Sequence, residues 1–391
     1  MINAEDSKLH RAGRYIRQPA GYRAFVPSPL PPEPSLKLSG LLRERLSEAD
    51  HALGRLDGAV LTLPNPDLFV FMYVRKEAVL SSQIEGTQSS LQNLLAAEAK
   101  LFDPETPTDV TEVANYVRAM NHGLSLLDEL PVSVRLIKEI HAKLMQGAAR
   151  GGQLNPGQLR TTQNWIGPAG STLRDAVFVP PPPHKVPKAL SDLERFLHDG
   201  FGLPALIQVG LAHAQFETIH PFLDGNGRVG RLLITFLLTE KKLLNKPVLY
   251  ISHYFRQHRA EYYERLQAIR NTGDWEGWLA FFLKGVVHVS REAAQTAAAI
   301  LRMREDNRAR ITDQLGRAAA NGHKVMDMLF DHPVVNVATV AEWLSLTPAG
   351  ANQLVNRLEK VGLLHETTGF ARNRRFIFKP YIELFDSGFA S

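Results

Sequence analysis

The chain has 391 residues, no cysteine and a formal net charge of +5. Its length allows two or three domains, and its 44% hydrophobic and 22% charged residues argue against a disordered or fibrous protein. The absence of cysteine excludes disulfides, thiolate metal sites and thiol nucleophiles. The mildly basic balance tolerates a phosphate-bearing ligand or nucleic acid without requiring either. Because no apolar run is long enough for a signal peptide or a membrane span, we expect a cytoplasmic protein.

The first part of the chain, residues 1–69, is predicted to be extended and then helical. Five prolines between Pro27 and Pro34 exclude a helix there. From about Leu36 to Gly322 apolar residues recur at three- and four-residue spacing, which predicts a mainly α fold. The run 231–244 is apolar on most sides, as expected of a buried central helix.

One stretch interrupts the helical pattern. Residues 161–183 contain two short extended runs, 164–166 and 177–179, separated by a loop rich in glycine, proline and serine. This order predicts a β-hairpin flap. A plain surface loop fits the pattern equally well.

The last part of the chain changes character. After a predicted linker helix over 301–322, residues 323–391 contain three short helical runs followed by "HETTGFARNRRFIFK", the order typical of a winged helix-turn-helix. Lys324–Ser391 carries seven Lys and Arg against seven Asp and Glu, and the expected recognition helix, 349–361, offers only two cations. The positive charge gathers in the wing, at Arg372, Arg374, Arg375 and Lys379. Binding to DNA therefore stays open but is less favoured than a protein contact.

The densest chemistry lies in "HPFLDGNGRVGR", residues 220–231. His220 precedes a proline, which disfavours helical backbone, so this histidine should lie where a helix becomes a loop. An imidazole placed there can act as a general base near neutral pH, although a lone histidine at a helix end is more often structural.

The glycines and charges that follow His220 predict an anion site. Gly225 and Gly227 permit positive φ, so successive amides can converge on an anion at the start of the next helix. Arg228 and Arg231 lie three residues apart on one helix face, which suits more than one phosphate. Asp224 would repel bare phosphates and is best explained as a ligand of Mg²⁺. An ordinary turn with solvated arginines is the plainer alternative.

These residues resemble the signature loop of Fic-domain proteins, and the similarity extends over about residues 70–285, including the flap. The resemblance implies a mainly α, Fic-type helical domain with a β-hairpin flap, over 106–300, followed by the small winged helix-turn-helix domain. Proteins of this family mostly transfer AMP from ATP to a hydroxyl side chain of a protein and release pyrophosphate.

Carried over by position, His220 would deprotonate the target Ser, Thr or Tyr hydroxyl, and Asp224 would bind the Mg²⁺. The flap would align the target protein by strand addition. The residues expected to contact ATP are Asp224, Gly225, Asn226, Gly227, Arg228, Val229, Gly230, Arg231, Tyr262 and Tyr263. The two tyrosines match a pair that lies near the nucleotide in similar proteins, although alone they would be interpreted as core residues.

Upstream, "VLSSQIEGTQSSLQNLL" predicts one helix that stops at Gly86 and a second that begins with a capping box between Ser89 and Gln92. Glu85 would then lie at the negative end of a helix dipole, where a carboxylate is disfavoured by roughly 0.3–1 kcal/mol unless a cation compensates. The pattern Ser81-x-x-x-Glu85-Gly86 is similar to the inhibitory motif of Fic proteins whose inhibitor precedes the core, here within 70–105. The resemblance implies that Glu85 pairs with Arg231, in space that the γ-phosphate needs.

The sequence therefore predicts a self-inhibited protein adenylyltransferase that acts on other proteins and on itself. Two alternatives stay open: another Fic-type reaction, such as transfer of a different nucleotide or removal of AMP, and a DNA-binding regulator whose Fic core senses a nucleotide. A homo-oligomer is compatible with either.

Overall fold

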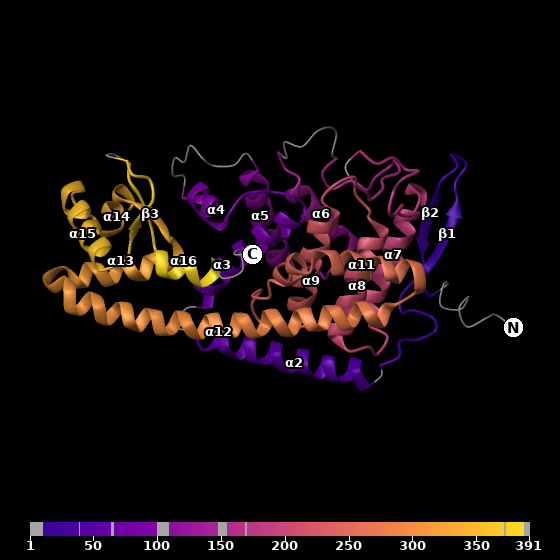
Figure 1. The fold of residues 1–391 in the computed structure, drawn as a ribbon, viewed down its shortest axis with the longest axis horizontal. Helices are drawn as coiled ribbons and strands as arrows, with labels where there is room; N and C mark the ends of the chain where they lie inside the picture. Colours follow the sequence, from indigo (N-terminus) through magenta and orange to yellow (C-terminus); the bar gives the residue numbers. More distant parts are fainter. Residues whose placement is uncertain are drawn as a thin grey trace.

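The structure is a computed structural model that describes residues 11–38, 40–63, 66–99, 109–147, 155–168, 170–370 and 373–386. Figure 1 shows a mainly helical molecule. A single helix of 41 residues, α12 (Trp275–Leu315), runs beneath it from the larger helical part to the C-terminal module. Among the helices described, none combines the length and apolar character needed to cross a bilayer.

The core is organised around α8 (Ala205–Ile219) and α9 (Asn226–Glu240), the two helices that flank the motif loop. Both are buried on nearly all sides, as predicted for the apolar run 231–244. Such helices need neighbours on every face. The surrounding helices are α3 (Pro66–Ile84), α5 (Val110–Leu126), α6 (Val134–Leu144), α7 (Val186–Asp199), α11 (Arg259–Thr272) and α12, while α10 (Ile251–Gln257) packs on α3 and α12.

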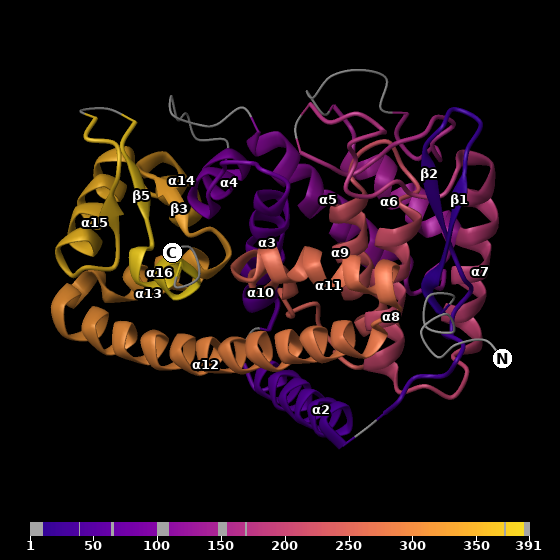
Figure 2. The ribbon, with the colours of Figure 1, turned by 45° about the vertical axis from the view of Figure 1, so that its right-hand side comes forward.

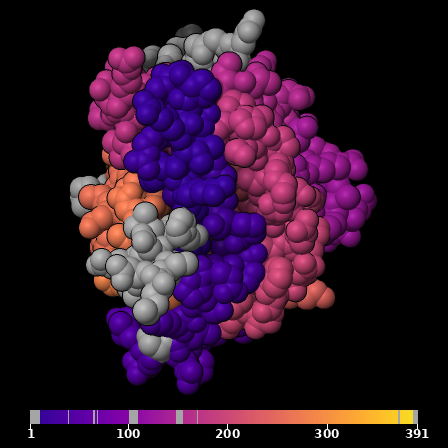
Figure 3. All heavy atoms as spheres, turned by 90° about the vertical axis from the view of Figure 1, so that its right-hand side faces the viewer, coloured from indigo at the N-terminus to yellow at the C-terminus, as the bar shows by residue number. Residues whose placement is uncertain are grey.

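The N-terminal segment forms a hairpin that was not predicted, made of β1 (Gly13–Arg17) and β2 (Arg23–Pro27) paired antiparallel. The proline-rich residues that follow are irregular, as expected, and lead to α2 (Gly40–Leu61), which packs along α12 (Figure 2). Figure 3 shows this N-terminal segment, in indigo, running down one face of the molecule between later parts of the chain.

The predicted flap is less regular than a hairpin. Its two extended runs are joined by one isolated bridge, in which Ile166 and Phe178 exchange hydrogen bonds of 2.8 and 3.1 Å. Pairing cannot extend beyond Val179, because the four prolines 180–183 have no N–H to donate. The run around Val179 instead joins the N-terminal hairpin, since its carbonyl accepts a hydrogen bond of 2.9 Å from the Phe25 amide. A short 3₁₀ turn, η1 (Pro183–Lys185), closes the segment.

The C-terminal module contains the three predicted helices and two predicted wing strands. Two elements were not predicted: a third strand, β3, which pairs with β5, and a final helix, α16. The elements are η2 (Gly316–Ala318), α13 (Ala319–Asp331), β3 (Val334–Asn336), α14 (Val337–Leu344), α15 (Pro348–Lys360), β4 (His365–Glu366), β5 (Arg375–Ile377) and α16 (Lys379–Asp386).

Two sequence-based boundaries are wrong. The linker proposed from residue 301 is no separate helix, because buried residues such as Ile300, Ile311 and Leu315 continue one helical stripe through α12. The helix after Glu85 is α4 (Leu91–Glu98), capped by Ser90 with Asn93 rather than by Ser89 with Gln92. Ser89 is not free to cap, since its hydroxyl donates to Asp109.

Candidate functional site

His220 lies where α8 ends, as predicted. Its backbone is left-handed (φ 49°), and its N–H closes the helix on the Phe216 carbonyl at 2.9 Å. The imidazole Nδ1 is buried. Burial, reinforced by the cations Arg270 and Arg160, lowers the pKa of His220 to about 3. The imidazole is therefore neutral, although a pKa this low also makes it a weak base.

Two residues at the start of the flap hold the backbone of the motif. Arg160 Nε donates to the His220 carbonyl at 2.9 Å, and its Nη2 reaches the Pro181 carbonyl at 2.5 Å. Asn164 Nδ2 donates to the Phe222 carbonyl at 2.8 Å. Sequence reasoning missed both residues, because an isolated arginine or asparagine in a loop is usually a surface residue. Their signal was only their position at the beginning of the flap.

The loop between the two central helices is fixed from within and from α6. Asn226 accepts a hydrogen bond from the Phe222 N–H and donates one to its carbonyl, both at 2.8 Å. The Phe222 ring stacks on His141 at 3.7 Å. Burial lowers the pKa of His141 to about 4, so its neutral ring accepts from the Gly157 amide at Nδ1 and donates to the Asp224 carbonyl at Nε2. His141 was another residue that the sequence did not reveal.

The first two glycines of the motif have different roles. Gly225 adopts the positive φ expected of it (77°) and is the N-cap of α9, a role that was not predicted. Gly227 does not have the expected positive φ, because it already lies in the first turn of the helix. It is instead a point of close approach: a Cβ there would lie 2.3 Å from Glu85 Oε1. The first amides of a helix have no carbonyl partner within it, which keeps this end suited to an anion.

Arg231 makes the predicted pair with Glu85. Its Nη2 donates to Glu85 Oε1 at 2.7 Å and to the Ser81 carbonyl at 2.9 Å, while Nε donates to Ser81 Oγ at 2.7 Å. The guanidinium is 1% exposed. Burial by itself would raise the pKa of Glu85, but the charge of Arg231 outweighs it and holds that pKa below its ordinary value. Gly86 follows with φ 96°, directly after the end of α3, as predicted.

Arg228 has a carboxylate partner of its own. Its Nη1 lies 3.2 Å from Glu112 Oε2, and its Nη2 lies 3.6 Å from Asp224 Oδ2. Glu112, in the first turn of α5, was not singled out from the sequence. Asp224 also accepts the Gly225 amide at 2.6 Å, and its side chain is 45% exposed. A single accessible carboxylate suits Mg²⁺, which is usually held by one or two carboxylates together with substrate phosphates and waters.

The other residues expected to contact ATP are Tyr262, Tyr263, Val229 and Gly230, and most of them have a structural role in the fold. Tyr262 is 1% exposed and its hydroxyl donates to His213 Nε2 at 2.9 Å, so it lies in the core, whereas Tyr263 is 39% exposed. Val229 is a core residue whose amide already bonds the Gly225 carbonyl. A Cβ on Gly230 would lie 2.3 Å from Glu217 Oε1, so this glycine serves helix packing.

In the C-terminal module one wing arginine is already engaged. Arg374 Nη2 donates to Asn352 at 2.8 Å and to Asn356 at 3.0 Å, both on α15. Arg372 lies outside the described residues. The cation expected at residue 374 is thus turned toward α15.

Comparison with known proteins shows which family the site resembles. Residues 43–125 match the model "Fic/DOC family N-terminal" and residues 131–238 match the model "Fic/DOC family". A probable protein adenylyltransferase of Aquifex aeolicus is 43% identical over 183 residues, which are 45% of this chain and 51% of the relative. The protein adenylyltransferase Fic of Drosophila grimshawi is 28% identical over 201 residues, or 50% of this chain and 36% of the relative. The chain thus spans about half or less of these two relatives.

Solved structures agree on the fold. A Fic family protein from Desulfovibrio desulfuricans superposes with a TM-score of 0.58 at 21% identity, covering 88% of this chain and 97% of that one. A Fic-domain-containing signalling protein from Bacteroides thetaiotaomicron superposes with a TM-score of 0.51 at 16% identity, covering 66% and 97%. Residues 43–125 and 131–238 are thus similar in sequence to the Fic/DOC family, and the fold is that of solved Fic-domain structures.

Proposed function

We propose that the protein is a nucleotidyltransferase that moves AMP from ATP to hydroxyl side chains of target proteins and of itself, and that Glu85 holds it inactive at rest. The observation that carries the proposal is the convergence of a neutral His220, the amide end of α9 and Arg231, with Arg231 bound by Glu85 at 2.7 Å. The adenylyltransferase names of the sequence relatives point to the same chemistry.

In the proposed reaction, the target Ser, Thr or Tyr hydroxyl attacks the α-phosphorus of ATP. His220 accepts the hydroxyl proton as the new P–O bond forms, and pyrophosphate leaves as the bond to the β-phosphate breaks. The first amides of α9 and the Arg228 guanidinium would stabilise the charge that develops on the phosphates. A Mg²⁺ at Asp224 would neutralise phosphate charge and orient the leaving group.

The inhibition follows from charge and space. Glu85 bonds the same guanidinium that would receive the terminal phosphate, and its Oε1 lies against Gly227. A carboxylate in that position repels a triphosphate. It also occupies the Arg231 Nη2 donor that would otherwise bind the terminal phosphate. ATP would then bind with its α-phosphate out of line for attack.

The target would dock on the flap. Around the single bridge Ile166–Phe178, the side chains of Trp165 and Val177 are 41% and 60% exposed. Apolar side chains beside unpaired extended backbone suit an added peptide strand.

The absence of cysteine agrees with a reducing compartment such as the cytoplasm.

The decisive experiment incubates wild type, Glu85→Gly and His220→Ala with each labelled nucleoside triphosphate, Mg²⁺ and a lysate, followed by mass spectrometry of modified proteins. We expect AMP adducts with Glu85→Gly, few with wild type and none with His220→Ala. If Glu85→Gly yields no nucleotidyl adduct, the transferase proposal is wrong. Adducts of another nucleotide would favour a different Fic-type transfer.

The C-terminal module calls for a separate measurement. We propose a protein-contact role for it, because one wing arginine is bound to α15 and the module carries no net positive charge. A gel shift of the full chain at several salt concentrations tests this role. Tight binding to DNA that weakens steeply with salt would contradict it and favour the regulator alternative.

A further inference from the structure

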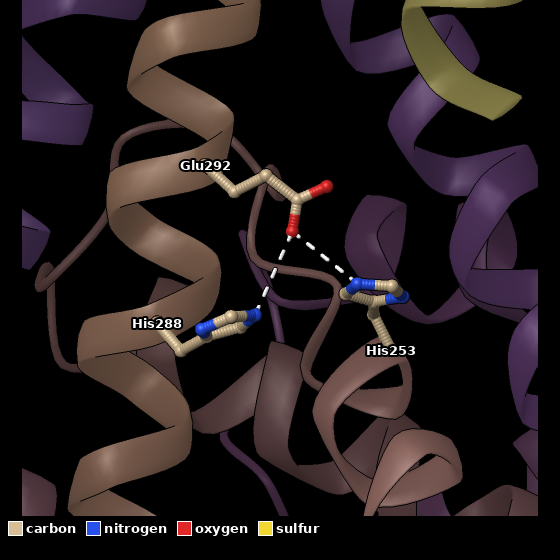
Figure 4. A group of neighbouring side chains, drawn as sticks. All are labelled: His253, His288 and Glu292. Carbon is tan, nitrogen blue, oxygen red and sulfur yellow. Dashed lines mark ion pairs between the residues drawn. The ribbon is translucent and has the colours of Figure 1, made fainter. Parts of the chain in front are cut away.

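A second cluster of chemistry-bearing side chains lies away from the motif loop. Figure 4 shows His253, from α10, and His288 and Glu292, from α12, pointing toward a common space. All three line a cavity of about 580 Å³ between α2, α10 and α12. None of them is used in the proposed AMP transfer.

The geometry of these three side chains suits a metal ion. One donor atom from each residue lies within 4.8 Å of the others. His253 Nε2 is 3.3 Å and His288 Nε2 is 4.0 Å from the same atom, Glu292 Oε2. His288 and Glu292 are four residues apart on one helix, a spacing that puts both on one face. Two imidazoles and one carboxylate are a common zinc ligand set that leaves a further position open.

The neighbouring cations do not occupy the same place. Lys76 Nζ lies 3.6 Å from Glu292 Oε1, the other carboxylate oxygen, and 4.5 Å from the centre of the Tyr250 ring. Arg291 is paired with Glu48 at 2.7 Å. Glu292 Oε2 is thus left facing the two histidines.

We propose that His253, His288 and Glu292 bind one divalent transition-metal ion of the zinc class. Water from the cavity completes the coordination. The ion cross-links α10 to α12 and thereby stabilises the part of the chain that leads into α11. This site is distinct from the Mg²⁺ proposed at Asp224, which oxygen ligands alone would hold.

The test measures metal binding directly and does not depend on AMP transfer. The full chain, without an affinity tag, is stripped with a chelator and titrated with Zn²⁺ by calorimetry and with Co²⁺ by visible absorption. We expect one site per chain and an intense tetrahedral-type Co²⁺ spectrum. His288→Gln should weaken binding by about tenfold or more and abolish that spectrum.

The matched control is His258→Gln, since His258 lines the same cavity but is not one of the three proposed ligands. This variant should bind as wild type does. Glu292→Gln should lose the site, and if it does not fold, His288→Gln still decides, because the His288 side chain is 48% exposed. Absence of stoichiometric binding in wild type, or equal binding by His288→Gln, would overturn the proposal.

Discussion

Two arginines one turn apart on α9 each meet a glutamate, yet the two pairs differ in a way that matters for function. Arg228 pairs with Glu112 at 3.2 Å, and Arg231 pairs with Glu85 at 2.7 Å. The Glu112 side chain is 8% exposed, whereas that of Glu85 is 36% exposed. The shorter ion pair is therefore the one whose glutamate is more exposed to solvent.

The helix ends explain the contrast. Glu112 lies in the first turn of α5, where the positive end of the helix dipole stabilises a carboxylate. Glu85 follows the last turn of α3, where the dipole opposes it and its stability depends on Arg231. We infer that Glu112 is a permanent partner of Arg228, while Glu85 is a partner that can be displaced.

The largest expected effect comes from removing each glutamate in turn. Glu85→Gly should raise AMP transfer by roughly tenfold to a hundredfold, because a hydrogen bond to a charged group contributes about 1.5–3 kcal/mol. Glu112→Gln should give no gain and should lower the melting temperature, since it leaves the buried Arg228 guanidinium with only the more distant and more exposed Asp224 as a carboxylate partner. Initial rates with labelled ATP and thermal melts measure both. If Glu112→Gln also raises AMP transfer, the proposed difference between a permanent Glu112 pair and a displaceable Glu85 pair is wrong.

A second effect tests the close approach at Gly227. In wild type, Gly227→Ala should destabilise the fold by about 1–3 kcal/mol, because the new methyl group would clash with the Glu85 carboxylate. In a Glu85→Gly background the cost should shrink to about 1 kcal/mol or less, because only Arg231 Nη1, at 3.0 Å from the new Cβ, remains close and alanine suits a helix better than glycine. Urea denaturation of the four proteins completes the cycle. Equal effects in both backgrounds would show that Glu85 does not rest on Gly227.

A third effect concerns pH. Because burial lowers the pKa of His220 to about 3, the unfolded chain takes up a proton below about pH 6.5 that the folded chain does not. Relative to His220→Gln, wild type should lose up to about 1.4 kcal/mol of stability per pH unit as pH falls from 6.5 toward 4. Urea denaturation at several pH values provides the comparison. A parallel pH dependence in the two proteins would mean that His220 is charged in the folded state.

The smallest effect is expected from Ser81→Ala. This change removes the bond to Arg231 Nε but leaves the Ser81 carbonyl and Glu85 as acceptors. AMP transfer should rise only a few-fold, because a neutral hydroxyl contributes less than a carboxylate. The same rate assay measures it. A gain as large as that of Glu85→Gly would assign the restraint to Ser81 instead.

The sequence predicted the site best where function depends on neighbouring residues. His220 before a proline and the spacing of the two arginines are local features, so the histidine at the helix end follows directly from them. The N-cap role of Gly225 was not predicted. The pair Glu85–Arg231 spans 146 positions, and it was predicted from the resemblance together with the unfavourable helix end. Gly227 does not adopt the positive φ that glycine permits, because it lies in the first turn of α9 and takes helical backbone angles.

Only the tertiary structure decided the contacts between side chains that no short sequence pattern predicts. Glu112, His141 and Arg160 are ordinary residues in the sequence, and they became part of the site because folding buried them beside the motif. The N-terminal hairpin and the continuous α12 also depend on partners elsewhere in the chain. By itself the sequence determined helical character, the motif and its charges, since these follow from periodicity and backbone preference. Burial and long-range pairing, which set the pKa of His220 and the restraint on Arg231, depend on distances that exist only in the folded chain.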